Sequence, residues 1–125
     1  MTPLEEARSH LAKAREFLDA AELTHDLGLY NAATASAITS GINSKDAICL
    51  ALTGRTMKAE SHHEAVAELK ASGQAGRGVA TSLGRLLKLK RKSQYQAASV
   101  SDAEAAKAID WAARMLDVTK SVVAP

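Results

Sequence analysis

The sequence predicts an all-α protein, an up-and-down bundle of four long or medium helices and one short helix, in one domain over residues 1–125. Alanine is abundant and only two prolines are present, a composition that favours helices. Three segments carry the Ser/Thr-x-x-Glu pattern that opens helices, and apolar residues recur at spacings of three and four. A chain of 125 residues has room for one hydrophobic core and not for two.

The first helix is predicted over residues 3–27. Thr2 and Glu5 form a capping box at its start, and its leucines and alanines recur on one face. Gly28 suits the position just after a helix end. Because the turn after Gly28 is very short, the next helix should lie antiparallel beside the first.

The second helix is predicted over residues 32–53, and Gly54 ends it. It is apolar or small on nearly all sides, which is typical of a helix in the middle of a bundle. Gly41 lies in its interior, where glycine costs about 1 kcal/mol relative to alanine. A close packing contact is therefore expected at Gly41.

The third helix is predicted to be short. It covers residues 62–71 and begins at a capping box that Ser61 opens. A loose hinge of glycines is expected next, before a fourth helix over residues 79–91. The hinge glycines are Gly73, Gly76 and Gly78.

Residues 92–100 are expected to be extended or irregular. The last helix is predicted over residues 102–122, with Ser101 and Glu104 forming its capping box. Trp111 is expected to anchor this helix against the core.

Composition excludes several classes of protein. No apolar run approaches the roughly 18 residues that a membrane span needs, and the acidic N-terminus does not resemble a secretory signal. Cys49 is the only cysteine, so no disulfide forms within the chain and a reducing, cytoplasmic location is expected. Aromatic residues make up 3%, which argues against a platform on which bases stack. The net charge of +2 is too small to imply nucleic acid by itself.

A basic cluster is the first candidate for function. Its cations fall within eight residues with no acid among them, and Arg85, Lys88 and Lys92 would line one helix face. The helix dipole accounts for one or two cations, whereas phosphate groups account for a whole stripe. Tyr95 either closes a phosphate pocket or stacks on a base, or it is half-buried and pins the irregular segment. The cluster consists of Arg85, Lys88, Lys90, Arg91 and Lys92.

The histidines at the start of the third helix are the second candidate. Either His62 or His63 acts as a general acid or base, with Arg55 as its electrostatic partner, or both histidines simply occupy an exposed helix start. Arg55 precedes His62 with six residues between them, a spacing used by metal-independent ribonucleases. Catalysis would require the two side chains to converge. No histidine or cysteine spacing typical of a metal site is present, so neither a metal nor a cofactor is predicted.

A polar cluster in the second helix is the third candidate. Ser40, Asn43 and Asp46 are spaced three apart in an otherwise apolar helix. Because buried polar groups need partners, these side chains either bond to another helix or face a cleft.

Five segments, in this order, resemble HEPN-domain proteins, small helical bundles named for higher eukaryote and prokaryote nucleotide binding. Residues 11–21 look like the family's opening helix, and residues 29–34 look like its short turn into a small-residue second helix. His62 opens the short helix, where members often place a histidine. The basic run of residues 85–95 and the alanine-rich residues 102–116 complete the likeness, which covers nearly the whole chain.

The resemblance implies a homodimer that contacts RNA or a nucleotide, often beside a nucleotidyltransferase-type or other antitoxin partner. The family's ribonucleases place an arginine, four to six residues and a histidine near the basic run, often with a tyrosine two residues later. Tyr95 fits this pattern, but Ser93 stands where the histidine would be. The resemblance therefore implies contact with RNA or a nucleotide without the usual catalysis. The alternatives are an active endoribonuclease toxin and a protein interaction module without nucleic-acid contact.

Overall fold

The structure is a computed structural model that describes residues 1–123. These residues contain no strand, which confirms the predicted all-α class. Their helices, in chain order, are α1 (Pro3–Asp26), α2 (Tyr30–Thr53), α3 (His62–Ala71), α4 (Gln74–Lys88), α5 (Lys90–Gln94) and α6 (Asp102–Val123).

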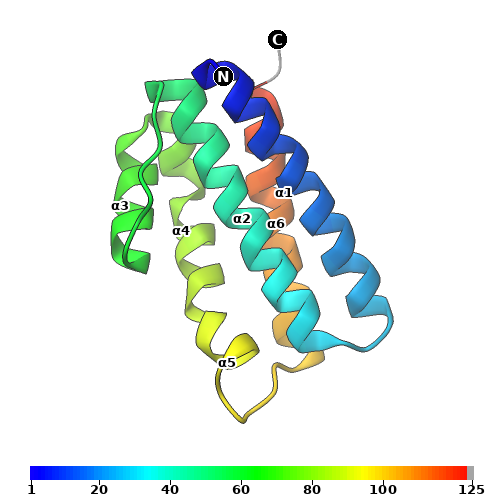
Figure 1. Ribbon diagram of the computed structural model, residues 1–125. Coiled ribbons are helices and arrows are strands. Elements are labelled where there is room, and N and C mark those ends of the chain that lie inside the picture. The colour runs from blue at the N-terminus through cyan, green and yellow to red at the C-terminus, as the bar shows by residue number, and fades with distance from the viewer. Residues whose placement is uncertain (124–125) are drawn as a thin grey trace.

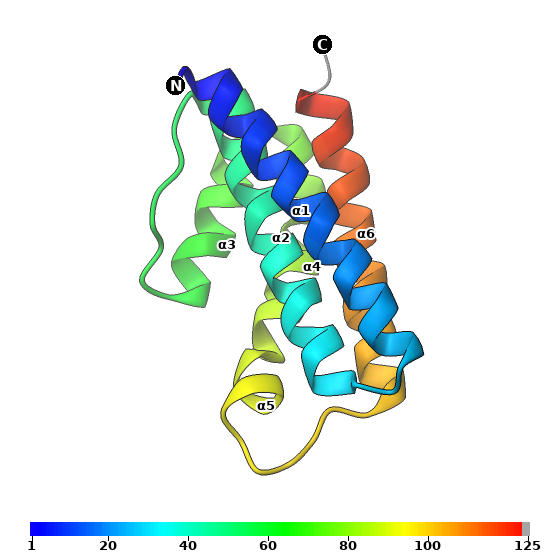
Figure 2. The same cartoon turned by 45° about the vertical axis from the view of Figure 1, so that its right-hand side comes forward.

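The four longest helices, α1, α2, α4 and α6, lie beside one another and alternate in direction along the chain (Figures 1 and 2). Each of α1 and α4 contacts both α2 and α6, which closes the bundle. The short α3 packs mainly against α4 on the outside, and α5 lies at the end of the bundle opposite the N-terminus. The predicted up-and-down bundle is thus confirmed. No helix within residues 1–123 is both long and apolar enough to cross a bilayer.

The centre of the bundle is α2, which contacts every other helix. Its small residues allow this close approach, and Gly41 is the tightest point. A Cβ built at Gly41 would lie 2.6 Å from Leu86 Cδ1 in α4 and 3.5 Å from Met115 Sδ in α6. The packing contact expected at this glycine is therefore present.

The helix ends follow from local hydrogen bonds. The hydroxyls of Thr2, Ser61 and Ser101 each accept a hydrogen bond of 3.1 Å from the backbone amide three residues later. Gly28 and Gly54 follow α1 and α2 with positive φ angles of 76° and 79°, a conformation that favours glycine. The three predicted N-caps and the two glycine ends are confirmed.

The predicted hinge before the fourth helix is wrong. Of its three glycines, only Gly73 has a positive φ, and Gly76 and Gly78 lie within α4. Gly76 serves close packing, because a Cβ there would overlap the Leu69 carbonyl oxygen and Ser72 Oγ. The glycine is needed to let α4 start directly against the end of α3.

The predicted end of the fourth helix is also wrong. α4 ends at Lys88, and Leu89 turns the chain through a hydrogen bond of 3.0 Å from its amide to the Leu86 carbonyl. The separate helix α5 follows, where part of the segment was expected to be irregular. Arg85, Lys88 and Lys92 therefore do not form a stripe on one continuous helix.

The last helix begins where expected. Trp111 of α6 is half-buried and packs against the edge of the main core. The Arg85 guanidinium lies over its ring, 5.9 Å from the ring centre. Trp111 thus anchors α6 beside α4. Its ring also forms a cation–π contact with Arg85, one of the cations of the basic run.

Candidate functional site

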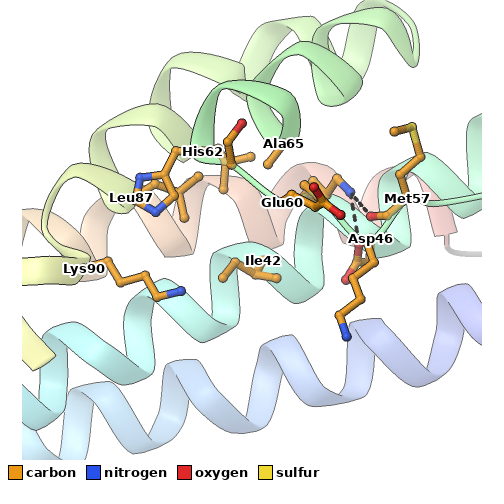
Figure 3. Close-up of a pocket in the computed structure, with 13 residues that line it drawn as sticks. Ile42, Asp46, Met57, Glu60, His62, Ala65, Leu87 and Lys90 are labelled. Carbon is orange, nitrogen blue, oxygen red and sulfur yellow. Dashed lines mark hydrogen bonds and ion pairs between the residues drawn. The ribbon is translucent and has the colours of Figure 1, made fainter.

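A pocket of about 270 Å³, here named the interhelical pocket, opens between α2, α3, α4 and the segment that joins α2 to α3 (Figure 3). Ile42, Leu83 and Leu87 supply its apolar wall. Its volume lies near the lower end of the range for small-ligand sites. The lining residues are Ile42, Lys45, Asp46, Met57, Lys58, Ala59, Glu60, Ser61, His62, Ala65, Leu83, Leu87 and Lys90.

Charged groups are distributed unevenly along this pocket. His62 and Lys90 lie toward one end in Figure 3, and Asp46 and Glu60 lie toward the other. Lys58 also lines the pocket. One end therefore suits an anionic group, and the other suits groups that donate hydrogen bonds.

The joining segment, residues 54–61, is here named the strap. It leaves the end of α2 and passes along the outside of α3 to reach the start of that helix (Figure 2). None of its residues is fully buried. Its position is set by polar contacts with α2 and α3.

Lys45 of α2 is the centre of these contacts. Its side chain is only 3% exposed, and its Nζ forms an ion pair with Glu68 of α3. Nζ also donates hydrogen bonds to Thr56 Oγ1 at 3.1 Å and to the Met57 carbonyl at 3.0 Å. Asp46 Oδ1 lies 3.3 Å from Nζ. One buried ammonium thus joins α2, α3 and the strap.

Burial alone would lower the pKa of Lys45. The hydrogen bond with Glu68 and the negative charges of Asp46 and Glu68 outweigh that effect, so the pKa of Lys45 is raised. Lys45 therefore stays protonated, and its role is to hold charges and the strap in place.

The predicted polar cluster of α2 divides among three separate partners. Ser40 Oγ donates to the Ala14 carbonyl at 2.7 Å, which links α2 to α1 inside the core. Asn43 Oδ1 lies 2.8 Å from Nδ1 of His10. Asp46 Oδ1 accepts a hydrogen bond of 2.6 Å from Thr56. Of the three predicted residues, only Asp46 lines the interhelical pocket.

The arginine and histidines of the ribonuclease-like spacing are not brought into one pocket. His62 follows the N-cap of α3 and lines the interhelical pocket. Arg55 is exposed and lines a second pocket of about 460 Å³, which shares Met57 with the interhelical pocket. His63 is exposed and lines neither pocket.

Three cations of the basic run, two of them exposed and Lys90 half-buried, lie at the turn between α4 and α5, here named the basic junction. It consists of Lys88, Lys90 and Arg91. Among the residues that the structure describes, no carboxylate forms a salt bridge with any of them. Lys90 also reaches the interhelical pocket, so the junction and the pocket are continuous.

The other members of the basic run have structural partners or stand apart. Lys92 Nζ lies 2.9 Å from Glu104 Oε1, and this contact joins α5 to the start of α6. The hydrogen bonds from Lys92 and from the Ser101 amide lower the pKa of Glu104. Tyr95 follows α5 and is 72% exposed, so it does not pin the irregular segment by burial, and it lines neither the interhelical pocket nor the second pocket.

Cys49 lines the second pocket together with Arg55, Met57 and Glu68. Its thiol is 1% exposed, and burial together with the charge of Glu68 raises its pKa to about 11. A neutral buried thiol is a poor nucleophile. The side chain is therefore a packing residue.

Sequence reasoning missed Lys45, Glu68, Lys58 and His10 as site residues. A lysine in the middle of a helix with small and apolar neighbours was a usable signal, because a buried lysine needs an acidic partner. Glu68 gave no comparable signal, since a glutamate in a short amphipathic helix is ordinarily solvated. Within residues 1–123, no three histidine, cysteine or acidic side chains are grouped to hold a metal ion.

Comparison with known proteins gives one family. The model of the HEPN domain matches residues 7–122 of the 125-residue chain. The match runs from the first turns of α1 to the last turn of α6. No curated protein matches the chain significantly.

Proposed function

Because the chain belongs to the HEPN domain family, a family of helical modules related to nucleotides and RNA, we propose that it binds RNA or a nucleotide through phosphate groups at the basic junction. The observation that carries this proposal is a set of three cations that form no salt bridge with any residue from 1 to 123. Cations without internal salt bridges are available to pair with the phosphate groups of a ligand. Such pairing releases the counterions that surround a nucleic acid, which favours binding.

The interhelical pocket supports the same proposal. Lys90 belongs both to the basic junction and to the pocket, and His62 lies at the same end of the pocket. A phosphate at the junction would therefore lie at the pocket mouth, and the attached group would face the apolar wall of Ile42 and Leu87. This arrangement favours a nucleotide unit over a featureless polyanion.

Binding of labelled single-stranded RNA, measured by fluorescence anisotropy over a range of salt concentrations, tests the proposal. The variant K88A/K90A/R91A should bind more weakly, and the slope of log K against log salt should fall by about 2, since each phosphate contact on a single strand contributes about 0.7.

The variant R8A/K13A/R15A is the matched control. It removes the same charge from exposed positions of α1, a helix that contacts neither α4 nor α5. Its slope should stay close to that of the wild type. Equal losses in the two variants would show that net charge alone controls binding, and this result would contradict a site at the junction.

An exposed apolar corner supports protein contacts as well. Leu23, Leu27 and Leu29, where α1 meets α2, are each more than half exposed. We propose that this corner is covered by a second copy of the chain in a homodimer, or by a nucleotidyltransferase-type or other antitoxin partner. Light scattering should therefore give twice the mass of one chain, or the single-chain mass if the partner is a different protein.

A further inference from the structure

The strap forms a large part of the interhelical pocket. Five of the thirteen lining residues belong to it, so the pocket exists in this form only while the strap lies against the helices. Met57 lines the second pocket too and therefore stands between the two pockets. The strap residues of the interhelical pocket are Met57, Lys58, Ala59, Glu60 and Ser61.

Beyond Arg55, whose carbonyl accepts a hydrogen bond of 2.9 Å from Thr53 Oγ1 at the end of α2, the strap is fastened at two short stretches. At the first, Thr56 and Met57 bond to Asp46 and Lys45 of α2, and the Met57 amide donates to Glu68 Oε2 at 2.8 Å. At the second, the Glu60 amide donates to Glu64 Oε2 at 2.9 Å. Lys58 and Ala59 between them have no hydrogen bond within the described residues.

Few apolar contacts reinforce this fastening. No strap residue is fully buried, and the Met57 side chain is 56% exposed. The helices on either side share a continuous core that includes Ile48 and Leu69. Segments held by a few polar contacts open at much lower free energy than the core around them. The fastening at Thr56 and Met57 is therefore a local contact that separates without unfolding the helices.

We propose that the strap is a lid over the interhelical pocket, which opens by release of Thr56 and Met57 from Lys45, Asp46 and Glu68 while the bundle stays folded. The proposal rests on the proposed function only for the identity of the ligand. An open strap admits the ligand to the apolar wall, and a closed strap covers it.

The strap also carries a positive charge, on Lys58, that favours the closed strap when an anionic ligand is bound. Lys58 on the strap and Lys90 at the start of α5 both line the pocket. A ligand that extends along the pocket from Lys90 gains Lys58 only when the strap is closed, because Lys58 lines the pocket as part of the strap. A ligand shifts such an equilibrium by its difference in affinity for the two states, and Lys58 supplies that difference.

Hydrogen exchange of the free protein, followed amide by amide by NMR, tests the opening. The Met57 amide should exchange at a rate that does not change with low denaturant, whereas amides in the middle of α2 should require global unfolding. The variant T56V removes two hydrogen bonds, the one that Thr56 donates to the Asp46 carboxylate and the one that it accepts from Lys45 Nζ, so Met57 exchange should accelerate by about tenfold or more.

The matched control is T24V, which removes a hydroxyl bonded to the Ala20 carbonyl on α1 and leaves the strap untouched. Met57 exchange in T24V should match the wild type. Exchange of Met57 only through global unfolding, or equal acceleration in T56V and T24V, overturns the lid.

Addition of single-stranded RNA tests the gain on closure. Saturating RNA should slow Met57 exchange by about tenfold or more in the wild type, and the K58A variant should bind RNA while losing most of this protection. RNA that binds without slowing Met57 overturns the lid and leaves the proposed function standing. RNA that does not bind contradicts the proposed function, and the free-protein comparison of T56V with T24V still decides whether the strap opens.

Discussion

A buried lysine carries an electrostatic cost that its partners must offset. Lys45 has more acceptors than protons to donate, because Asp46, Glu68, Thr56 and the Met57 carbonyl all surround its ammonium. Such a network contributes little net stability compared with a well-packed apolar residue, but it fixes the elements that it joins in one arrangement. Lys45 is therefore best understood as the residue that specifies where the strap and α3 lie on α2.

Replacement of Lys45 by methionine should destabilise the fold by about 3 kcal/mol, because the carboxylate of Glu68 then loses its counter-charge in a poorly solvated position. Urea unfolding followed by circular dichroism measures this change. The double variant K45M/E68Q should recover part of the loss, since a neutral amide oxygen still accepts from the Met57 amide. K70M, at an exposed position of α3, is the control and should change stability little. A loss in K45M no larger than that in K70M would contradict the role given to Lys45.

For the polar residues of α2, the sequence predicted which residues need hydrogen-bond partners but not which residues those partners are. Ser40, Asn43 and Asp46 were correctly expected to be bonded to other helices or to face a cleft, because an apolar helix leaves a polar group no other outcome. Which of the three faces the pocket depends on His10, Thr56 and other residues far along the chain, and spacing within one helix carries no information about them.

Among the elements, α3 and α4 show how a glycine misleads sequence reasoning. Three glycines in six residues are typical of a flexible hinge, yet two of them lie inside α4. The difference is tertiary: Gly76 is fully packed against the end of α3, and Gly78 faces open space. Propensity alone treats these two residues identically, so their roles become visible only once α3 and α4 are placed together.

Two alanine substitutions in α4 should change stability in opposite directions. G78A places a methyl group in open space and should stabilise the fold by about 0.5 to 1 kcal/mol, the gain from helix propensity. G76A gains the same propensity, but its methyl group overlaps the Leu69 carbonyl oxygen and Ser72 Oγ, so it should destabilise by about 1 to 3 kcal/mol. Thermal unfolding of the two variants measures the difference, and similar behaviour of both would contradict the close packing of α3 on α4.

The break between α4 and α5 was likewise invisible in the sequence. No glycine or proline marks it, and the run of leucines and lysines continues through it. The turn at Leu89 lets Lys92 reach Glu104, a residue that also caps α6. This contact separates Lys92 from the other cations, which is why the predicted stripe reduces to the basic junction.

For the whole molecule, the fold was largely predictable. Three capping boxes, two glycine ends and an apolar second helix determine where the helices begin, end and turn, and an all-helical chain with short turns has few ways to close. The pocket was not predictable, since its walls come from α2, α4 and the strap, and no pattern in one segment describes a cavity between several. The same limit applies to Arg55 and His62, because a spacing along the chain does not say which pocket each side chain lines.

The separation of these two residues leads to a prediction about activity. Cleavage of RNA without a metal needs a base near the 2′-hydroxyl and a cation near the phosphate. His62 lines the interhelical pocket, whereas Arg55 lines the second pocket. We therefore expect labelled RNA, incubated with the protein and a chelator, to be bound and to remain intact.

The variants R55A and H62A distinguish cleavage by this protein from cleavage by a contaminating ribonuclease. Contaminating ribonuclease would cleave RNA equally in wild type, R55A and H62A, and such a result is removed by further purification. Cleavage by the wild type that both R55A and H62A abolish would contradict the prediction, because it would require the two side chains to act on one phosphate. In a single chain in this conformation the two residues line different pockets, so their convergence would need an open strap or a second chain. Repeating the assay with T56V separates these routes: a released strap should raise the rate if one chain supplies both residues and should leave it unchanged if the partner supplies one.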